Sequence, residues 1–220
     1  MIARPPLLIP LLALAGFLAL LGVVATDWAP LERFDLAVSD ALRRWGQEHP
    51  AVIDVTRVAT DTAAGASMVG VGIALIVYFL ATRQRAVVLF CVLAMVCVPA
   101  VRALLHWLLH HPRPLDPFVL VDSNSFPSGH SSNAATMAVG AILLFWPRLA
   151  RLGRILLVTA AVLFAVAIGM TRLILLAHWP VDVLGAWLLA LAALPLLAHA
   201  VTLPRPNPLH ALSMIKASFK

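Results

Sequence analysis

The segment His106–Pro114 ends a long apolar stretch with a group of histidine and arginine side chains. Pro114 disfavours helical backbone at the residue before it, so Arg113 is expected to leave the helix in an extended conformation. Its guanidinium would then point beyond the apolar stretch, where it could bind an oxyanion through several N–H groups. An arginine at a membrane surface can also simply contact lipid headgroups, so this segment must be interpreted together with the two that follow.

The segment Phe126–Asn133 is predicted to form an anion-binding turn. Pro127 fixes one residue of the turn, and Gly129 lets the backbone approach a ligand closely. An apolar stretch follows directly, so the amides from Ser128 onward would lie at a helix N-terminus, which binds anions through free N–H groups and the helix dipole. A capped turn accounts for the proline and serines of this segment but not for His130.

The segment Thr171–Asp182 combines a histidine and a carboxylate with a second arginine, Arg172. His178 and Asp182 are four residues apart, so on a helix they share one face and can form a hydrogen bond. A carboxylate on one ring nitrogen fixes the tautomer of a histidine and leaves the other nitrogen as a directed nucleophile or base. A solitary His–Asp pair in a helical bundle is usually structural, but this pair accompanies two arginines and an anion-binding turn.

Together the three segments predict a metal-independent site for a phosphate group. Guanidiniums and helix amides stabilise a tetrahedral oxyanion and its transition state, while two histidines can divide nucleophilic attack and proton donation. The sequence offers no carboxylate cluster of the kind that binds Mg²⁺. A zinc site built from His106, His110 and His111 is disfavoured because no further acidic or thiolate ligand is nearby. We therefore expect no metal and no cofactor.

The elements that position these segments are predicted to be membrane-spanning helices. The chain of 220 residues is 62% hydrophobic and 12% charged, whereas soluble domains are typically about half apolar and about a quarter charged. A helix needs about 20 mostly apolar residues to cross a bilayer. Six stretches are candidates: Leu7–Ala25, Ala63–Thr82, Ala86–Leu109, Ser131–Trp146, Ile155–Leu176 and Trp179–Val201. We predict an all-α integral membrane bundle of six transmembrane helices, forming one domain over residues 1–220.

Two features refine this prediction. The first span could be a cleaved signal peptide, but its apolar run is long for that role, and we expect it to be retained. The segment after it, Asp27–Thr62, contains apolar residues at helical spacing with polar residues between them, which predicts an amphipathic helix in the membrane interface. Its apolar positions are Phe34, Ala37, Val38, Ala41, Leu42 and Trp45, and its polar positions are Asp35, Ser39, Asp40, Arg43 and Arg44.

The segments between the spans alternate sides and differ sharply in charge. The set that includes both termini contains no Asp or Glu; its basic residues are Arg4, Arg83, Arg85, Arg148, Arg151, Arg154, Arg205, Lys216 and Lys220. The other set contains every acidic residue of the chain, Asp61 and Asp122 among them, and all three chemical segments. Because cytoplasmic loops carry the excess of Lys and Arg, we expect cytoplasmic termini and an extracytoplasmic site. Topology then accounts for the net charge of +6, and no nucleic-acid partner is needed.

The three segments resemble the signature of the type 2 phosphatidic acid phosphatases, which glucose-6-phosphatases, bacterial acid phosphatases and vanadium haloperoxidases share. That signature is Lys, six residues and Arg-Pro; then Pro-Ser-Gly-His; then Ser-Arg, five residues, His, three residues and Asp. The chain resembles it in order over about residues 101–186. His106 replaces the lysine and Thr171 replaces the serine. Arg102, one helical turn before His106, could supply the missing cation.

The resemblance implies a role for each matching residue. His178 would attack phosphorus and form a phosphohistidine, Asp182 would orient His178, and His130 would protonate the leaving oxygen and then activate water. The phosphoryl oxygens would be held by Arg113, Arg172, Ser128, Gly129 and, in place of the lysine, His106.

The resemblance also implies a membrane lipid phosphatase of the bacterial cytoplasmic membrane. The small size is similar to that of bacterial undecaprenyl-diphosphate phosphatases, so undecaprenyl diphosphate is the expected substrate, with phosphatidylglycerophosphate and phosphatidic acid as other substrates of this branch. A lipid phosphotransferase would use the same intermediate and stays open as an alternative. A transporter or structural membrane protein with a relict site is disfavoured because the reactive residues are intact. The oligomeric state is left open.

Overall fold

The computed structural model describes residues 1–60, 65–121 and 123–202. Over these ranges the regular structure is helical, which confirms the predicted all-α fold. The elements are α1 (Leu8–Ala25), α2 (Ala29–Glu48), α3 (Pro50–Thr60), α4 (Gly65–Ala81), α5 (Arg85–Leu109), α6 (Gly129–Phe145), the short 3₁₀ helix η2 (Trp146–Arg148), α7 (Arg151–Ile174) and α8 (Pro180–Thr202).

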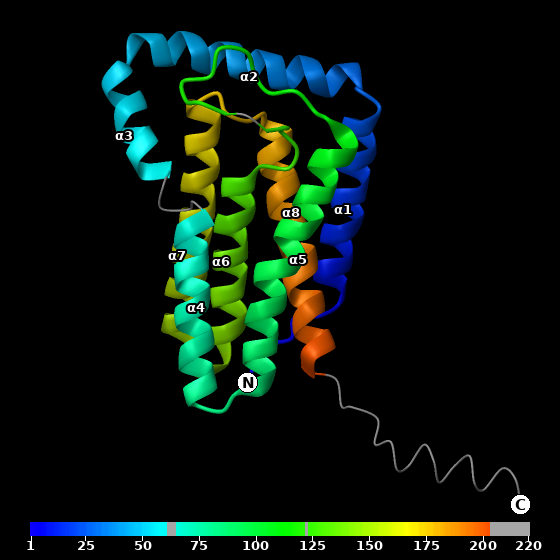
Figure 1. Cartoon of the computed structure of the whole chain (residues 1–220), viewed down its shortest axis with the longest axis vertical. Coiled ribbons are helices and arrows are strands. Elements are labelled where there is room, and N and C mark those ends of the chain that lie inside the picture. The colour runs from blue at the N-terminus through cyan, green and yellow to red at the C-terminus, as the bar shows by residue number, and fades with distance from the viewer. Residues whose placement is uncertain (61–64, 122, 203–220) are drawn as a thin grey trace, which may run out of the picture.

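The predicted spans correspond to helices that run alongside one another in the bundle: α1, α4, α5, α6, α7 and α8 (Figure 1). Among the described residues, four of these helices, α1, α5, α7 and α8, are long and apolar enough to cross a membrane. The other two are described over 17 residues each; α4, which follows the undescribed residues 61–64, is predominantly apolar, whereas α6 begins with the polar residues of the predicted anion-binding turn. The chain is therefore a multi-pass membrane bundle.

Helix α8 lies at the centre of the bundle, against α1, α5 and α6. Its buried face carries small side chains such as Ala186 and Ala190, which let neighbouring helices approach closely. Gly185 serves the same purpose, because a Cβ atom there would lie 2.5 Å from the ring of Phe126. Phe126 in turn stacks on Phe17 of α1, with ring centroids 6.1 Å apart. The loop before α6 is thus packed between the first and last helices.

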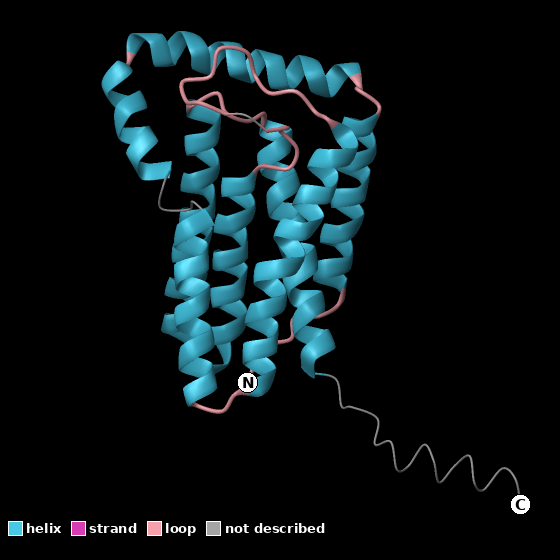
Figure 2. Cartoon of the chain, in the orientation of Figure 1, coloured by secondary structure: helices cyan, strands magenta, loops and turns pink. Residues whose placement is uncertain are grey.

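The two ends of the bundle differ as the charge pattern predicts. The N-terminus and the end of α8 lie at one end, and α2 with the loop between α5 and α6 covers the other (Figure 1; Figure 2 shows the same loop in pink). The connections α4–α5 and α6–α7 fall at the end with the termini, so the basic segments that lack acidic residues are gathered there. Arg205, Lys216, Lys220, Asp61 and Asp122 lie outside the described residues.

The predicted amphipathic helix is present as α2, which lies across the end of the bundle (Figure 1). The face that it buries is not the apolar one: its buried residues are Asp35, Ser39 and Gly46. Phe34 and Trp45, from the apolar set, are exposed. Asp35 and Ser39 of the polar set therefore pack on the protein, while Phe34 and Trp45 of the apolar set face outward.

Helix α3 was not predicted from the sequence. Pro50 occupies its first position, where the missing N–H costs nothing. The helix buries Ile53, Thr56 and Thr60 and packs beside α7. Its last residue places a hydroxyl next to the end of α7, which matters for the site.

Candidate active site

The three chemical segments meet at the end of the bundle that α2 covers. The loop between α5 and α6 approaches the turn between α7 and α8, since Arg113 contacts both Ala177 and His178. The start of α6 approaches α8, since the Ser128 N–H donates to the carbonyl of Asp182 at 3.1 Å. Segments far apart in the sequence thus converge on one buried site.

The predicted His178–Asp182 pair is formed. The Nδ1 atom of His178 lies 3.3 Å from Oδ2 of Asp182, and both side chains are buried. The same oxygen accepts from the Trp179 N–H at 2.8 Å and from the Ser125 hydroxyl. Pro180 starts α8, so the histidine stands just outside the helix while the aspartate lies in its first turn. A carboxylate held by three donors is well placed to fix the histidine ring.

The electrostatic surroundings keep His178 neutral. Burial, followed by the positive charges of Arg113 and Arg172, lowers its pKa well below the usual range. A neutral ring carries one proton, and the nearby Asp182 carboxylate assigns that proton to Nδ1. The Nε2 atom then carries no proton and keeps its lone pair, as a nucleophile requires.

Arg113 lies on that Nε2 atom. Its Nη1 is 3.1 Å from Nε2 of His178 and also donates to the carbonyl of Ala177. Its other nitrogens donate to Ser123 and Asn124, through contacts of 2.5 Å, 2.9 Å and 3.2 Å. Burial lowers the pKa of Arg113, but a guanidinium stays protonated in proteins. The loop therefore fixes a cation directly at the ring nitrogen that faces away from Asp182.

The predicted turn at the start of α6 is formed with one difference. Ser128 is the N-cap residue, and its Oγ accepts from the Ser131 N–H at 3.4 Å. Its own N–H was expected to face an anion, but it is bonded to the carbonyl of Asp182. His130, the second residue of α6, is half-buried. The turn thus joins α6 to α8 and leaves the amides from Gly129 onward as the ones at the helix N-terminus.

The two residues of α5 that could replace the family lysine behave differently. His106 is turned toward the loop, with Nε2 3.1 Å from the carbonyl oxygen of Pro127. Arg102 reaches the start of α6: a Cβ atom at Gly129 would lie 2.9 Å from Arg102 Nη1. The guanidinium at the α6 N-terminus therefore comes from Arg102, and the ring of His106 supports the turn.

Arg172 enters the site from the last turn of α7. It is buried, and its Nη1 donates to the Thr60 hydroxyl of α3 at 2.9 Å. Thr171 contacts the same hydroxyl at 3.0 Å. Thr60 and Ser125 were not predicted from the sequence. Their contacts with Arg172 and Asp182 join segments that are far apart in the sequence, and no local pattern indicates such contacts. Among the described residues, no three His, Cys, Asp or Glu side chains come together as a metal site would require.

Residues 105–206 match the family model of the PAP2 superfamily. The structure is also similar to the crystal structure described as the first transmembrane PAP2-type phosphatidylglycerolphosphate phosphatase, from Bacillus subtilis, with a TM-score of 0.77 and 25% sequence identity. The similarity covers 90% of this chain and 98% of the Bacillus chain. Over residues 105–206 this chain is thus similar to the PAP2 superfamily, and over most of its length to a PAP2-type membrane phosphatase.

The similarity to the PAP2 superfamily agrees with the enzyme class expected from the sequence, a hydrolase of phosphoric esters. The matched range contains the three segments that the resemblance rested on, from His106 to Asp182. Arg102, which the structure places beside Gly129, lies just before it. No curated protein sequence matches the chain significantly.

Proposed function

We propose that this protein is an integral membrane lipid phosphatase of the PAP2 type that hydrolyses a lipid-linked phosphate or diphosphate through a phosphohistidine on His178. One observation carries this proposal. His178 is neutral, its Nδ1 faces the Asp182 carboxylate, and its Nε2 faces the Arg113 guanidinium. A phosphoryl group drawn to that guanidinium would meet the Nε2 lone pair directly.

The first step forms the phosphoenzyme. Nε2 of His178 attacks phosphorus, and the bond from phosphorus to the leaving oxygen breaks. His130, in the first turn of α6, donates a proton to that oxygen. As the ring becomes positively charged, Asp182 stabilises it through Nδ1–H.

The second step releases phosphate. His130, now deprotonated, takes a proton from water, and the resulting hydroxide attacks the phosphohistidine so that the P–N bond breaks. Negative charge on the phosphoryl oxygens is stabilised in both steps by Arg113 and Arg172 and by the Gly129 amide. Ser128 contributes by fixing the turn, because its N–H is engaged with Asp182. The chemistry proposed needs no metal or cofactor.

The proposed location is the bacterial cytoplasmic membrane, with both termini in the cytoplasm and the site on the extracytoplasmic side. Support comes from the distribution of charge. The connections that carry Arg83, Arg85, Arg148, Arg151 and Arg154 gather at the end of the bundle opposite the site. Lysine and arginine in short connections favour the cytoplasmic side.

Two substrates deserve direct comparison. Undecaprenyl diphosphate is our first candidate, because the small size and the signature resemble the bacterial polyprenyl-diphosphate phosphatases. Phosphatidylglycerophosphate is the second, because the similar Bacillus subtilis protein is described as a phosphatase of that lipid. Transfer of the phosphoryl group to a lipid acceptor, in place of water, would use the same phosphohistidine.

The test is phosphate release by the detergent-purified full chain from undecaprenyl diphosphate, phosphatidylglycerophosphate and phosphatidic acid. Release is expected to persist in EDTA and to be abolished in His178→Ala. His49→Ala, which alters an exposed histidine of the α2–α3 turn, is the matched control and should retain activity. Activity that survives His178→Ala would remove the assigned nucleophile. Label transferred to a lipid acceptor without phosphate release would indicate a phosphotransferase.

A further inference from the structure

The two oxygens of the Asp182 carboxylate have unequal surroundings. Oδ2 accepts from Ser125, His178 and Trp179, whereas buried Oδ1 has no hydrogen-bond partner within the described ranges. A buried carboxylate oxygen without a donor is costly. Nε2 of His111 lies 4.0 Å from Oδ1. That atom is itself buried and without a partner in the described part of the chain.

His111 is held so that this nitrogen faces the active-site carboxylate. Its carbonyl accepts from the Ser125 N–H at 2.9 Å, so its backbone is tied to the residue whose hydroxyl contacts Asp182. Its ring packs edge-on against Phe126, with centroids 6.5 Å apart and an interplanar angle of 89°. The two orphan atoms therefore face each other across a gap about 1 Å longer than a hydrogen bond.

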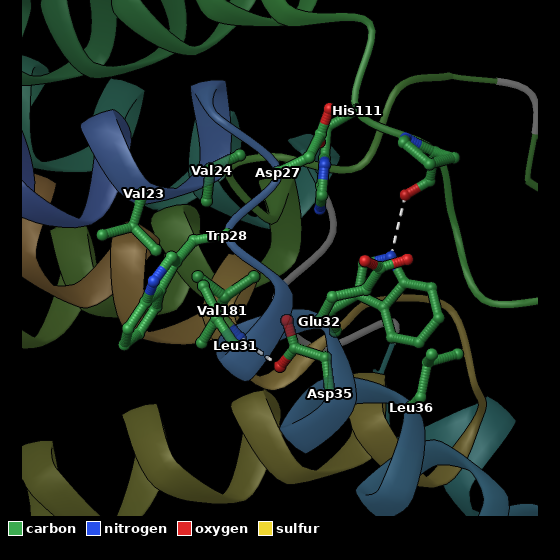
Figure 3. A pocket seen from close by; sticks show the side chains of 12 residues that line it. Val23, Val24, Asp27, Trp28, Leu31, Glu32, Asp35, Leu36, His111 and Val181 are labelled. Carbon is green, nitrogen blue, oxygen red and sulfur yellow. Dashed lines mark hydrogen bonds between the residues drawn. The ribbon is translucent and has the colours of Figure 1, made fainter.

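One side of the His111 ring faces open space. Its side chain lines a cavity of about 100 Å³ between α1, α2 and the start of α8. Figure 3 shows His111 pointing into this cavity from one side and Asp35 of α2 from the other. The His111 side chain is thus not tightly packed on the side of this cavity, so neighbouring atoms there do not lock its ring in one orientation.

We infer that His111 is a positioning residue for the reaction: its Nε2–H donates to Oδ1 of Asp182 and holds the carboxylate between two imidazoles, His111 and His178. This inference rests on the proposed phosphatase function. A donor on Oδ1 fixes the plane of the carboxylate, and that plane sets the direction of the bond from Oδ2 to Nδ1 of His178. Partners that orient a functional side chain in this way typically contribute about 10- to 100-fold to activity.

Asp35 is the other acceptor that His111 could use, because it faces the same cavity (Figure 3). Its Oδ1 already accepts from the Val181 N–H at 3.3 Å. Burial, with a further contribution from the negative charge of Asp182, raises the pKa of Asp35 to about 7. Asp27 and Glu32 also line the cavity, but both are exposed. Asp182 is therefore the acceptor in greatest need of the His111 proton.

Two substitutions of His111 distinguish the effect of its hydrogen-bond donor from the effect of its aromatic ring. His111→Phe keeps the aromatic contact with Phe126 and removes the donor, whereas His111→Gln keeps an N–H donor and removes the ring. We expect kcat to fall about 10- to 100-fold in His111→Phe with KM within about twofold, and to stay within about fivefold of wild type in His111→Gln. His110→Gln, which alters the exposed neighbour, is the matched control.

A double-mutant cycle with Asp182→Asn then asks whether His111 acts through the carboxylate. The effect of His111→Phe should largely disappear in the Asp182→Asn background, because residues that act as a unit are not additive. An undiminished effect there, or a His111→Phe enzyme as active as wild type, would overturn the inference. If His111→Phe does not fold, the inference would be overturned by a His111→Gln enzyme that is as impaired as Asp182→Asn. Wild-type protein that releases no phosphate would count against the proposed function instead.

Discussion

The Nη1 atom of Arg113 lies 3.1 Å from Nε2 of His178, on the opposite side of the ring from Asp182. The histidine is thus held between a carboxylate at one nitrogen and a guanidinium at the other. The first arrangement fixes the tautomer, and the second places a phosphate-binding cation at the lone pair of Nε2. In the proposed reaction the guanidinium would exchange its contact with Nε2 for one with a phosphoryl oxygen.

Arg113→Lys should therefore be far from conservative. The guanidinium uses all three nitrogens, on Ser123, Asn124, Ala177 and His178, and an ammonium cannot reproduce that fork. We expect kcat/KM for lipid phosphate hydrolysis to fall about 100- to 1,000-fold, as for loss of one donor to a transition-state oxyanion. Arg33→Lys, on the exposed side of α2, is the control. Near-normal activity in Arg113→Lys would mean that this arginine serves only as a point charge.

The low pKa of His178 predicts a specific pH dependence. The neutral ring is the reactive form, and burial with the charges of Arg113 and Arg172 lowers its pKa. The acidic limb of the kcat/KM profile assigned to His178 should then lie below about pH 6.5, the ordinary histidine value. Arg113→Gln removes one of those positive charges and should move this limb toward higher pH. A limb that stays in place in Arg113→Gln would contradict this electrostatic coupling.

The same shift has a consequence for stability. A histidine kept neutral in the fold binds fewer protons than in the unfolded chain once the pH falls below about 6.5. Its contribution is therefore complete above that pH and decreases as the pH falls toward the lower folded value. Asp35 acts in the opposite direction, because its folded pKa of about 7 lies above the ordinary value of 3.8. In the fold it holds its proton over a range where the unfolded chain has released it.

Asp35→Asn should consequently stabilise the protein at high pH. Above pH 7 the wild type must either keep a proton on Asp35 or bury its charge, whereas Asn carries no charge and its oxygen can still accept from the Val181 N–H. We expect a higher apparent unfolding temperature in detergent at pH 8, by about 2–4 °C for each kcal/mol gained, and little change at pH 5. Asp40→Asn, on the exposed side of α2, is the control. An equal gain at both pH values would point to packing rather than charge.

Local patterns predicted the parts of this site that lie within one helical turn of each other. The four-residue spacing of His178 and Asp182 and the turn before α6 are examples, because backbone geometry alone brings those atoms together. The hydropathy of continuous stretches likewise predicted the apolar helices, because it too is a local property of the sequence. The Thr60–Arg172 contact joins residues 112 positions apart, and no sequence pattern in either segment predicts it. Helix α3 was not predicted because it is only 11 residues long and contains many β-branched side chains, which have lower helix propensity.

Helix α2 illustrates a different limit. Its amphipathic spacing predicted the helix correctly, but periodicity does not say which face meets the protein. At this end of the bundle the buried partners include backbone amides such as Val181 N–H, so a carboxylate-bearing face packs inward. Phe34 and Trp45 then remain outside, as suits a helix beside lipid.

His106 occupies the position of the family lysine, and Arg102 lies one helical turn before it. His106 contacts the Pro127 carbonyl, which a lysine ammonium could also reach, so His106→Lys should keep or raise activity. Arg102 holds its guanidinium against Gly129 at the N-terminus of α6, so Arg102→Gln should lower kcat/KM about 100-fold. The double variant His106→Lys/Arg102→Gln tests whether Arg102 replaces the family lysine. If the lysine at position 106 restores the activity lost in Arg102→Gln, Arg102 supplies the cation that His106 does not. Complete loss of activity in His106→Lys alone would instead give His106 a role of its own.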